Sequence, residues 1–201
     1  FIAVAAIIYL LLRYSIQEKQ KMQDRLAEAH RLLTMEQARS ERLLLNILPS
    51  PVAERLKRAE QPIADGFADA TVMFADIVNF TQVATHLTPD QVFSMLNEVF
   101  SAFDELAERF GLEKIKTIGD AYMVAGGLNN ANGRHAEAIA DMALAMHAHL
   151  KRSVVGNGMR LAIRVGIGTG PVVAGVVGKK KFIYDVWGDT VNIASRITAE
   201  G

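Results

Sequence analysis

Residues 113–125 read EKIKTIGDAYMVA, and this stretch decides the fold. Charged and apolar side chains alternate over 113–118, as in a strand with one buried face, and an apolar run follows at 122–125. Gly119 and Asp120, which lie between the two runs, are residues that favour turns. The stretch therefore predicts a β-hairpin with a carboxylate at its turn.

The segments on either side of this hairpin predict a mixed domain. Upstream, 71–75 (TVMFA) is a strand-type run and 89–110 has the apolar spacing of an amphipathic helix. Downstream we expect a helix over 135–150, strands over 161–167 and 172–177 joined by a turn at 168–171, a strand over 182–186, and a helix over 189–198. This order indicates an α+β fold, a ferredoxin-like βαββαβ core with an extra strand and helix, in which the helices cover one face of the sheet.

The N-terminal residues 1–12, FIAVAAIIYLLL, carry no charge. A membrane span needs about 20 apolar residues, so this run is either a buried or signal-like segment or the last part of a span. We favour the span, because no starting Met and no cleavage site accompany it, and expect 1–14 to be the C-terminal part of a transmembrane helix. The basic residues after it then place the rest of the chain on the cytoplasmic side of the cell membrane: Arg13, Lys19, Lys21 and Arg25.

Residues 15–48 contain no Gly or Pro and predict one long helix that ends before Pro49. Two sevenfold series run along it: Leu26, Leu33, Ser40 and Ile47, and Met22, Ala29, Glu36 and Leu43. Such a seam is typical of a solvated amphipathic helix or of a parallel coiled coil that pairs two chains. A short helix over 52–58 and a linker over 61–66 complete a signalling segment, 15–66, ahead of a globular domain, 67–201.

Composition excludes some chemistry. Lys and Arg number 22 and Asp and Glu number 22, so net charge gives no indication of a nucleic-acid partner. The chain has no cysteine, which excludes disulfides and thiolate metal sites. A metal would be bound by oxygen atoms or by histidine.

Two aspartates lie where strands end, Asp76 after 71–75 and Asp120 in the hairpin turn. Alone, each is explained as a helix cap or a turn former. Together they could share divalent cations, because Mg²⁺ prefers carboxylates combined with phosphate oxygens. Residues 77–81 then lead into a helix, whose first N–H groups can bind phosphate. The pattern predicts a site for a nucleoside triphosphate with metal.

A second set of polar residues lies late in the chain. Asp185 ends a strand, and Asn192 and Arg196 are four positions apart on the next predicted helix, so they share one face. Taken alone, such a pair is explained by ordinary surface hydrogen bonding.

Four stretches in this order resemble the motifs of the class III adenylyl/guanylyl cyclases. They are FADIVNFT at 74–81, KIKTIGD at 114–120, RVGIGTG at 164–170 and YDVWGDTVNIASR at 184–196. The similarity covers 68–201, and NILP at 46–49 resembles the transducer segment that precedes this domain in the family. The layout is similar to that of membrane-anchored bacterial cyclases of the mycobacterial type.

The resemblance implies a role for each matching residue. Metal ligands for two Mg²⁺ or Mn²⁺ ions are implied at Asp76, Ile77 and Asp120. Triphosphate binding is implied for Ile77, Val78, Asn79, Phe80, Thr81 and Arg164, and purine recognition for Lys116 and Asp185. For Arg164, an ion pair at the edge of the sheet is the alternative explanation. Asn192 would orient the ribose, and Arg196 would stabilise charge on the α-phosphate.

The purine pair favours ATP. A lysine donor suits adenine N1 and an aspartate acceptor suits the N6 amino group, whereas guanylyl cyclases typically carry Glu and Cys there. The implied activity is adenylate cyclase, converting ATP to cyclic AMP and pyrophosphate in signal transduction. The alternatives are a guanylyl cyclase, a diguanylate cyclase, which would need a GGDEF-like turn that does not occur, and a non-catalytic dimerising module.

The family also implies a head-to-tail homodimer, with each site between two catalytic domains. One domain would supply the aspartates, and the other would supply Lys116, Asp185, Asn192 and Arg196. Family members usually continue beyond the position of Gly201 with further strands and a triphosphate-binding lysine, so the C-terminal part of the domain is expected to be missing from this sequence.

Overall fold

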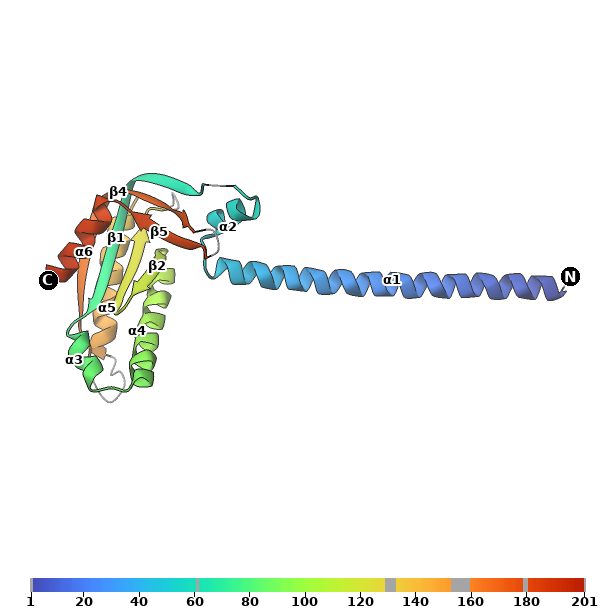
Figure 1. Cartoon of the computed structure of the whole chain (residues 1–201), viewed down its shortest axis with the longest axis horizontal. Helices are drawn as coiled ribbons and strands as arrows, with labels where there is room; N and C mark the ends of the chain where they lie inside the picture. Colours follow the sequence, from blue (N-terminus) through green and yellow to red (C-terminus); the bar gives the residue numbers. More distant parts are fainter. Residues whose placement is uncertain (1, 61, 129–132, 153–159, 179–180, 201) are drawn as a thin grey trace. The chain divides into compact units, whose positions relative to one another are not determined.

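The computed structural model describes residues 2–60, 62–128, 133–152, 160–178 and 181–200. The chain divides into two compact units, 1–53 and 54–201, which are described separately. The first unit is dominated by one helix and the second by a five-stranded sheet with its covering helices (Figure 1).

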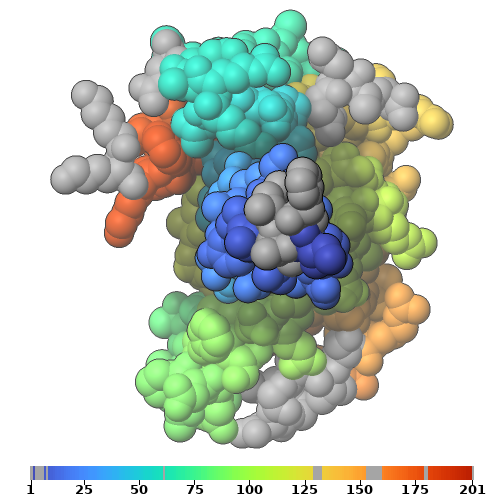
Figure 2. All heavy atoms as spheres, turned by 90° about the vertical axis from the view of Figure 1, so that its right-hand side faces the viewer, coloured from blue at the N-terminus to red at the C-terminus, as the bar shows by residue number. Residues whose placement is uncertain are grey.

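Helix α1, Ile2–Leu45, is a single helix of 44 residues that includes the apolar N-terminal run. The helix predicted over 15–48 is confirmed, but it ends earlier, because Pro49 disfavours helical backbone just before it. Along its length the seam residues are exposed, among them Met22, Leu26, Leu33 and Leu43. Figure 2 looks along α1 from its N-terminal end. Pairing of two such helices remains a prediction.

Membrane insertion was the other expectation for this unit. In the described parts of the chain, no helix holds a stretch that is both long and apolar enough to cross a membrane.

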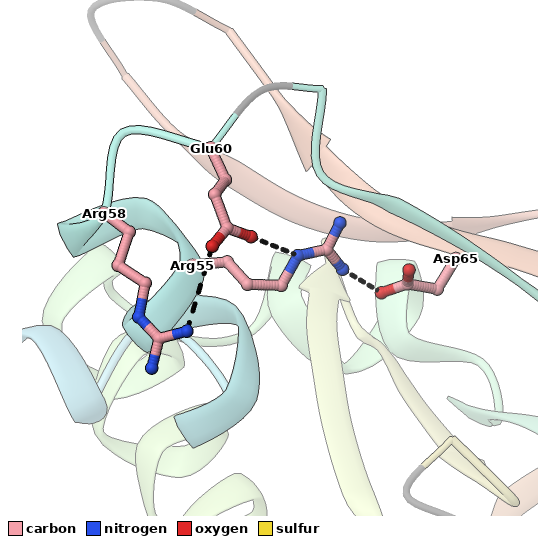
Figure 3. Close-up of polar contacts among 4 residues, drawn as sticks. All are labelled: Arg55, Arg58, Glu60 and Asp65. Carbon is pink, nitrogen blue, oxygen red and sulfur yellow. Dashed lines mark hydrogen bonds and ion pairs between the residues drawn. The ribbon is translucent and has the colours of Figure 1, made fainter.

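Helix α2, Ser50–Lys57, forms where the short helix was expected. Arg55, from its last turn, contacts two acidic residues that follow it in the chain (Figure 3). Its Nε lies 3.5 Å from Glu60 Oε2, and its terminal nitrogen lies 2.5 Å from Asp65 Oδ2. Arg58 adds a longer contact to Glu60, at 3.9 Å. Together these ion pairs connect the end of α2 to the first strand.

The sheet is antiparallel throughout, in the order β2-β3-β1-β4-β5. Its strands are β1 (Ala64–Ile77), β2 (Glu113–Ile118), β3 (Ala121–Gly126), β4 (Ile163–Val177) and β5 (Ile183–Trp187). The hairpin predicted at 113–125 is confirmed as β2 and β3. The linker expected over 61–66 was wrong in its second half, because residues 64–66 pair with Gly175, Ala174 and Val173 of β4.

The turn expected at 168–171 was also wrong, because β4 runs through it without a break. Gly168 pairs with Val72 and Gly170 pairs with Ala70. Pro171 falls where the register shifts between Phe67 and Ala70. A proline is tolerated at such an irregularity because no ladder hydrogen bond from its nitrogen is required.

Helices cover both faces of the sheet, so the expectation of one covered face was wrong. Helices α4 (Pro89–Phe110) and α5 (His135–Arg152) pack on one face with β1 residues Met73, Ala75 and Ile77. Helix α6 (Asp189–Glu200) packs on the other, where Val72 and Phe74 are buried. A strand buried on both faces has a continuous apolar run, which accounts for the sequence TVMFA.

Two glycines let α6 approach β4 closely. A Cβ on Gly166 would overlap the Ala194 carbonyl oxygen, and one on Gly168 would lie 2.7 Å from the Thr190 carbonyl oxygen. Helix backbone therefore rests directly on strand backbone, which fixes the position of α6 and of the polar residues it carries.

We expect Gly166→Ala to lower the free energy of unfolding by about 3 kcal/mol, because the added methyl group must displace α6. Urea unfolding of the purified chain measures this loss. Gly66→Ala is the matched control, since a Cβ there meets nothing within 4 Å, and its effect should stay below about 1 kcal/mol. Equal effects from both substitutions would contradict the close packing of α6.

Candidate active site

The two predicted metal carboxylates lie together at one end of the sheet. Asp76, near the end of β1, is opposite Ala121 of β3 and Arg164 of β4. Asp120 immediately precedes Ala121, in the β2–β3 turn, and is thus placed beside Asp76. The expectation that the first strand pairs beside the hairpin is therefore confirmed.

The charges at this site influence one another. Burial raises the pKa of Asp120, and the neighbouring carboxylate of Asp76 raises it further. Arg164 donates a hydrogen bond to Asp76 Oδ2 at 2.6 Å, while its buried Nε has no partner among the described residues. A carboxylate whose ionisation is disfavoured by burial and by a neighbouring carboxylate is one that a divalent cation would stabilise.

The described residues contain no group of three or more His, Cys, Asp or Glu side chains that could hold a metal ion. The protein side chains at this site are thus the two carboxylates, and a cation there would complete its shell with phosphate, water or backbone oxygens. The side chain of Ile77 is buried in the core, so a metal contact from this residue would use its carbonyl oxygen.

The segment after Asp76 makes a tight turn. Val78 N–H donates to the Ala162 carbonyl at 2.9 Å, so this amide already has a hydrogen-bond partner within the protein. Asn79 has left-handed backbone (φ 56°), a conformation that asparagine tolerates, and it precedes α3, Phe80–Thr85. Phe80 packs against the core, while Asn79 and Thr81 are exposed. Phosphate binding by residues 77–81 stays a prediction.

The predicted purine-recognition pair is assembled in the structure. Lys116 Nζ lies 2.5 Å from Asp185 Oδ2. Lys116 belongs to β2 and Asp185 to β5, which occupy opposite edges in the strand order, so the sheet curls until its edges meet. The lysine side chain is 35% exposed and the aspartate 13%, which leaves the pair accessible to a ligand.

The predicted transition-state pair is separate from these groups. Asn192 and Arg196 lie on the exposed side of α6, while Ala194 and Thr198 face the sheet. In the described part of the chain, no hydrogen bond or ion pair joins either residue to the carboxylate site or to the purine pair. One chain therefore does not connect all the predicted groups into one site.

One polar residue near the purine pair is not distinguished by the local sequence pattern. Glu113 looks like the solvent-facing member of an alternating strand, yet it is half-buried and its pKa is raised by burial. Its position depends on an irregularity in β2 that the residue types do not reveal.

An antiparallel sheet with paired carboxylates at one end and a lysine–aspartate pair across its edges is the arrangement of a nucleotidyl cyclase domain. Residues 63–201 match the family model described as the adenylate and guanylate cyclase catalytic domain, and the chain belongs to this family. The resemblance to class III cyclases is thereby confirmed.

Among its relatives, the adenylate cyclase of Mycobacterium tuberculosis is 48% identical over 172 residues, which are 85% of this chain and 39% of that protein. The atrial natriuretic peptide receptor 2 of Homo sapiens is 46% identical over 169 residues, 83% of this chain and 16% of the receptor. The chain thus spans well under half the length of these relatives.

A solved structure with the same fold is the catalytic core of a rhodopsin-guanylyl cyclase with converted specificity, in complex with ATPαS. It is 36% identical to this chain, with a TM-score of 0.65, and the match covers 68% of this chain and 74% of that one.

Proposed function

We propose that this chain is an adenylate cyclase domain that converts ATP to 3′,5′-cyclic AMP and pyrophosphate. The observation that carries the proposal is the contact between Lys116 and Asp185 across the two sheet edges. An ammonium donor beside a carboxylate acceptor complements the N1 acceptor and N6 amino donor of adenine. Guanine presents the reverse pattern at these positions. The lysine donor would then face a donor, and the aspartate acceptor would face an acceptor.

Overall identity does not by itself assign the substrate. The relatives at 48% and 46% identity carry different names, an adenylate cyclase and a peptide receptor. Substrate choice is therefore assigned to the purine pair rather than to general similarity.

Asp76 and Asp120, with the Ile77 carbonyl, would hold two divalent cations, Mg²⁺ or Mn²⁺. When bound, these ions lower the pKa of the ribose 3′-hydroxyl and neutralise charge on the phosphates. The chain's own residues orient the substrate and stabilise the transition state. Asn192 positions the ribose, and Arg196 balances the negative charge that develops on the α-phosphate.

We further propose that two chains build each site, in a head-to-tail homodimer. The exposed position of Asn192 and Arg196 on α6 supports this, because a second chain could cover that side of the helix. One chain then supplies Asp76 and Asp120, and the other supplies the purine pair and the α6 residues. The exposed seam of α1 supports a parallel coiled coil ahead of the catalytic domain.

The remaining part of the proposal concerns location. The uncharged run at 1–12 and the basic residues after it support an anchor in the cell membrane, with the catalytic domain on the cytoplasmic side. In this arrangement α1 would carry a signal from the membrane to the cyclase domains.

The test is cyclic nucleotide formation by the purified chain with Mn²⁺, with ATP and GTP offered separately. We expect cyclic AMP from ATP and a much slower reaction with GTP. A preference for GTP would overturn the role of Lys116 and Asp185. Nucleotide binding without any product would instead favour a non-catalytic module.

A further inference from the structure

The strand that carries Lys116 contains a bulge. Along β2, Glu113 is opposite Ala125 and Lys114 is opposite Val124, but Lys116 is already opposite Met123. Ile115 is therefore the extra residue. Residues three apart on a regular strand point to opposite faces, but the bulge brings Glu113 and Lys116 to the same face.

The surrounding contacts identify that face. Ala125 and Met123, the two partners of Glu113 and Lys116, are both buried in the cluster on the α6 side of the sheet. Lys114 points the other way, since its Nζ lies 2.7 Å from Asp104 of α4. Glu113 and Lys116 thus lie on the face toward which β5 curls.

Tyr184, which precedes Asp185 on β5, lies within the electrostatic influence of Glu113. Burial raises the pKa of Tyr184 to about 12, and the nearby charges of Glu113 and Asp65 add to this shift. The charge of Glu113 on β2 therefore acts on β5 at the residue that precedes Asp185, the partner of Lys116.

The two carboxylates that act on Tyr184 differ in whether they have a charged partner. Asp65 is paired with Arg55 at 2.5 Å (Figure 3). Within the described part of the chain, Glu113 has no hydrogen bond or ion pair, and burial alone accounts for its raised pKa. A half-buried carboxylate with no protein partner is costly, and a hydrogen-bond donor on a ligand would relieve that cost.

We propose that Glu113 is a further specificity-determining residue, whose carboxylate makes the purine pocket favour a base with an amino group at position 6 over one with a carbonyl oxygen there. The inference rests on the proposed function of the Lys116–Asp185 pair. An additional negative charge on the same face of β2 as Lys116 attracts the N6 amino donor of adenine and repels the O6 acceptor of guanine.

The test is the ratio of kcat/KM for ATP to that for GTP in Glu113→Gln, which keeps the size of the side chain and removes its charge. We expect the ratio to fall about tenfold, through a loss with ATP and a gain with GTP. Glu113→Asp, which keeps the charge, should retain most of the preference. Glu105→Gln, on the exposed side of α4, is the matched control and should leave the ratio unchanged.

A second readout separates this inference from the proposed function. Equilibrium binding of 3′-deoxy-ATP and 3′-deoxy-GTP, which cannot cyclise, should show the same tenfold change in preference for Glu113→Gln. If the wild-type chain makes no cyclic nucleotide, the proposed function fails, while the binding ratio still decides the role of Glu113. An unchanged ratio in Glu113→Gln, or equal losses for both nucleotides, would overturn the inference.

Discussion

Replacing Asp120 by Ala is expected to reduce cyclic nucleotide formation by about 1000-fold or more, the largest effect of any single substitution considered for this chain. Asp120 and Asp76 are the two side chains available to hold divalent cations at this end of the sheet, and removing one leaves a single carboxylate. The measurement is turnover of ATP at saturating Mn²⁺, together with Mn²⁺ binding followed by electron paramagnetic resonance. Turnover and Mn²⁺ binding should be lost together.

Asp120 is a better choice than Asp76 for this experiment. Asp76 also accepts the hydrogen bond from Arg164, so its removal leaves a half-buried guanidinium unpaired and affects folding as well as metal binding. Asp141→Ala, on the exposed side of α5, removes a similar charge from an element outside the hairpin and should be neutral. Turnover above about a tenth of the wild-type rate in Asp120→Ala would be incompatible with a two-metal site.

The second large effect is expected from Arg196→Ala, which should lower kcat by about 100- to 1000-fold while changing KM little. The guanidinium is assigned to charge that develops only in the transition state, so its removal spares substrate binding. Because Arg196 is exposed on α6, the melting temperature should also be unchanged. Arg160→Ala removes an exposed arginine elsewhere and serves as the control. A rise in KM with normal kcat would assign Arg196 to ground-state binding instead.

Local sequence patterns predicted the elements better than their arrangement. The alternation over 113–118 and the helical spacing over 89–110 arise from single elements, and both are observed. The glycines at 168 and 170 read as a turn because their second role, making room for α6 against β4, depends on a helix later in the chain. The apolar run at 71–75 indicates burial but cannot say that helices cover both faces.

In the candidate site, too, some features follow from local sequence and others depend on the three-dimensional arrangement. The proximity of Asp76 and Asp120 follows from strand ends and a hairpin turn, so the sequence could predict it. The contact between Lys116 and Asp185 joins opposite sheet edges and depends on how far the sheet curls, so it was expected only from family resemblance. Glu113 was missed because one bulge residue, Ile115, reverses the face to which it points.

The central claim is that two chains together form one adenylate cyclase site. The most direct test of this claim is to mix two inactive variants. Asp120→Ala lacks the metal half and Arg196→Ala lacks the transition-state half. A dimer of one of each has one intact site, so random mixing should restore about a quarter of wild-type cyclic AMP formation from ATP. A mixture that is no more active than its two components, although the chains are shown to dimerise, would contradict a site shared between them.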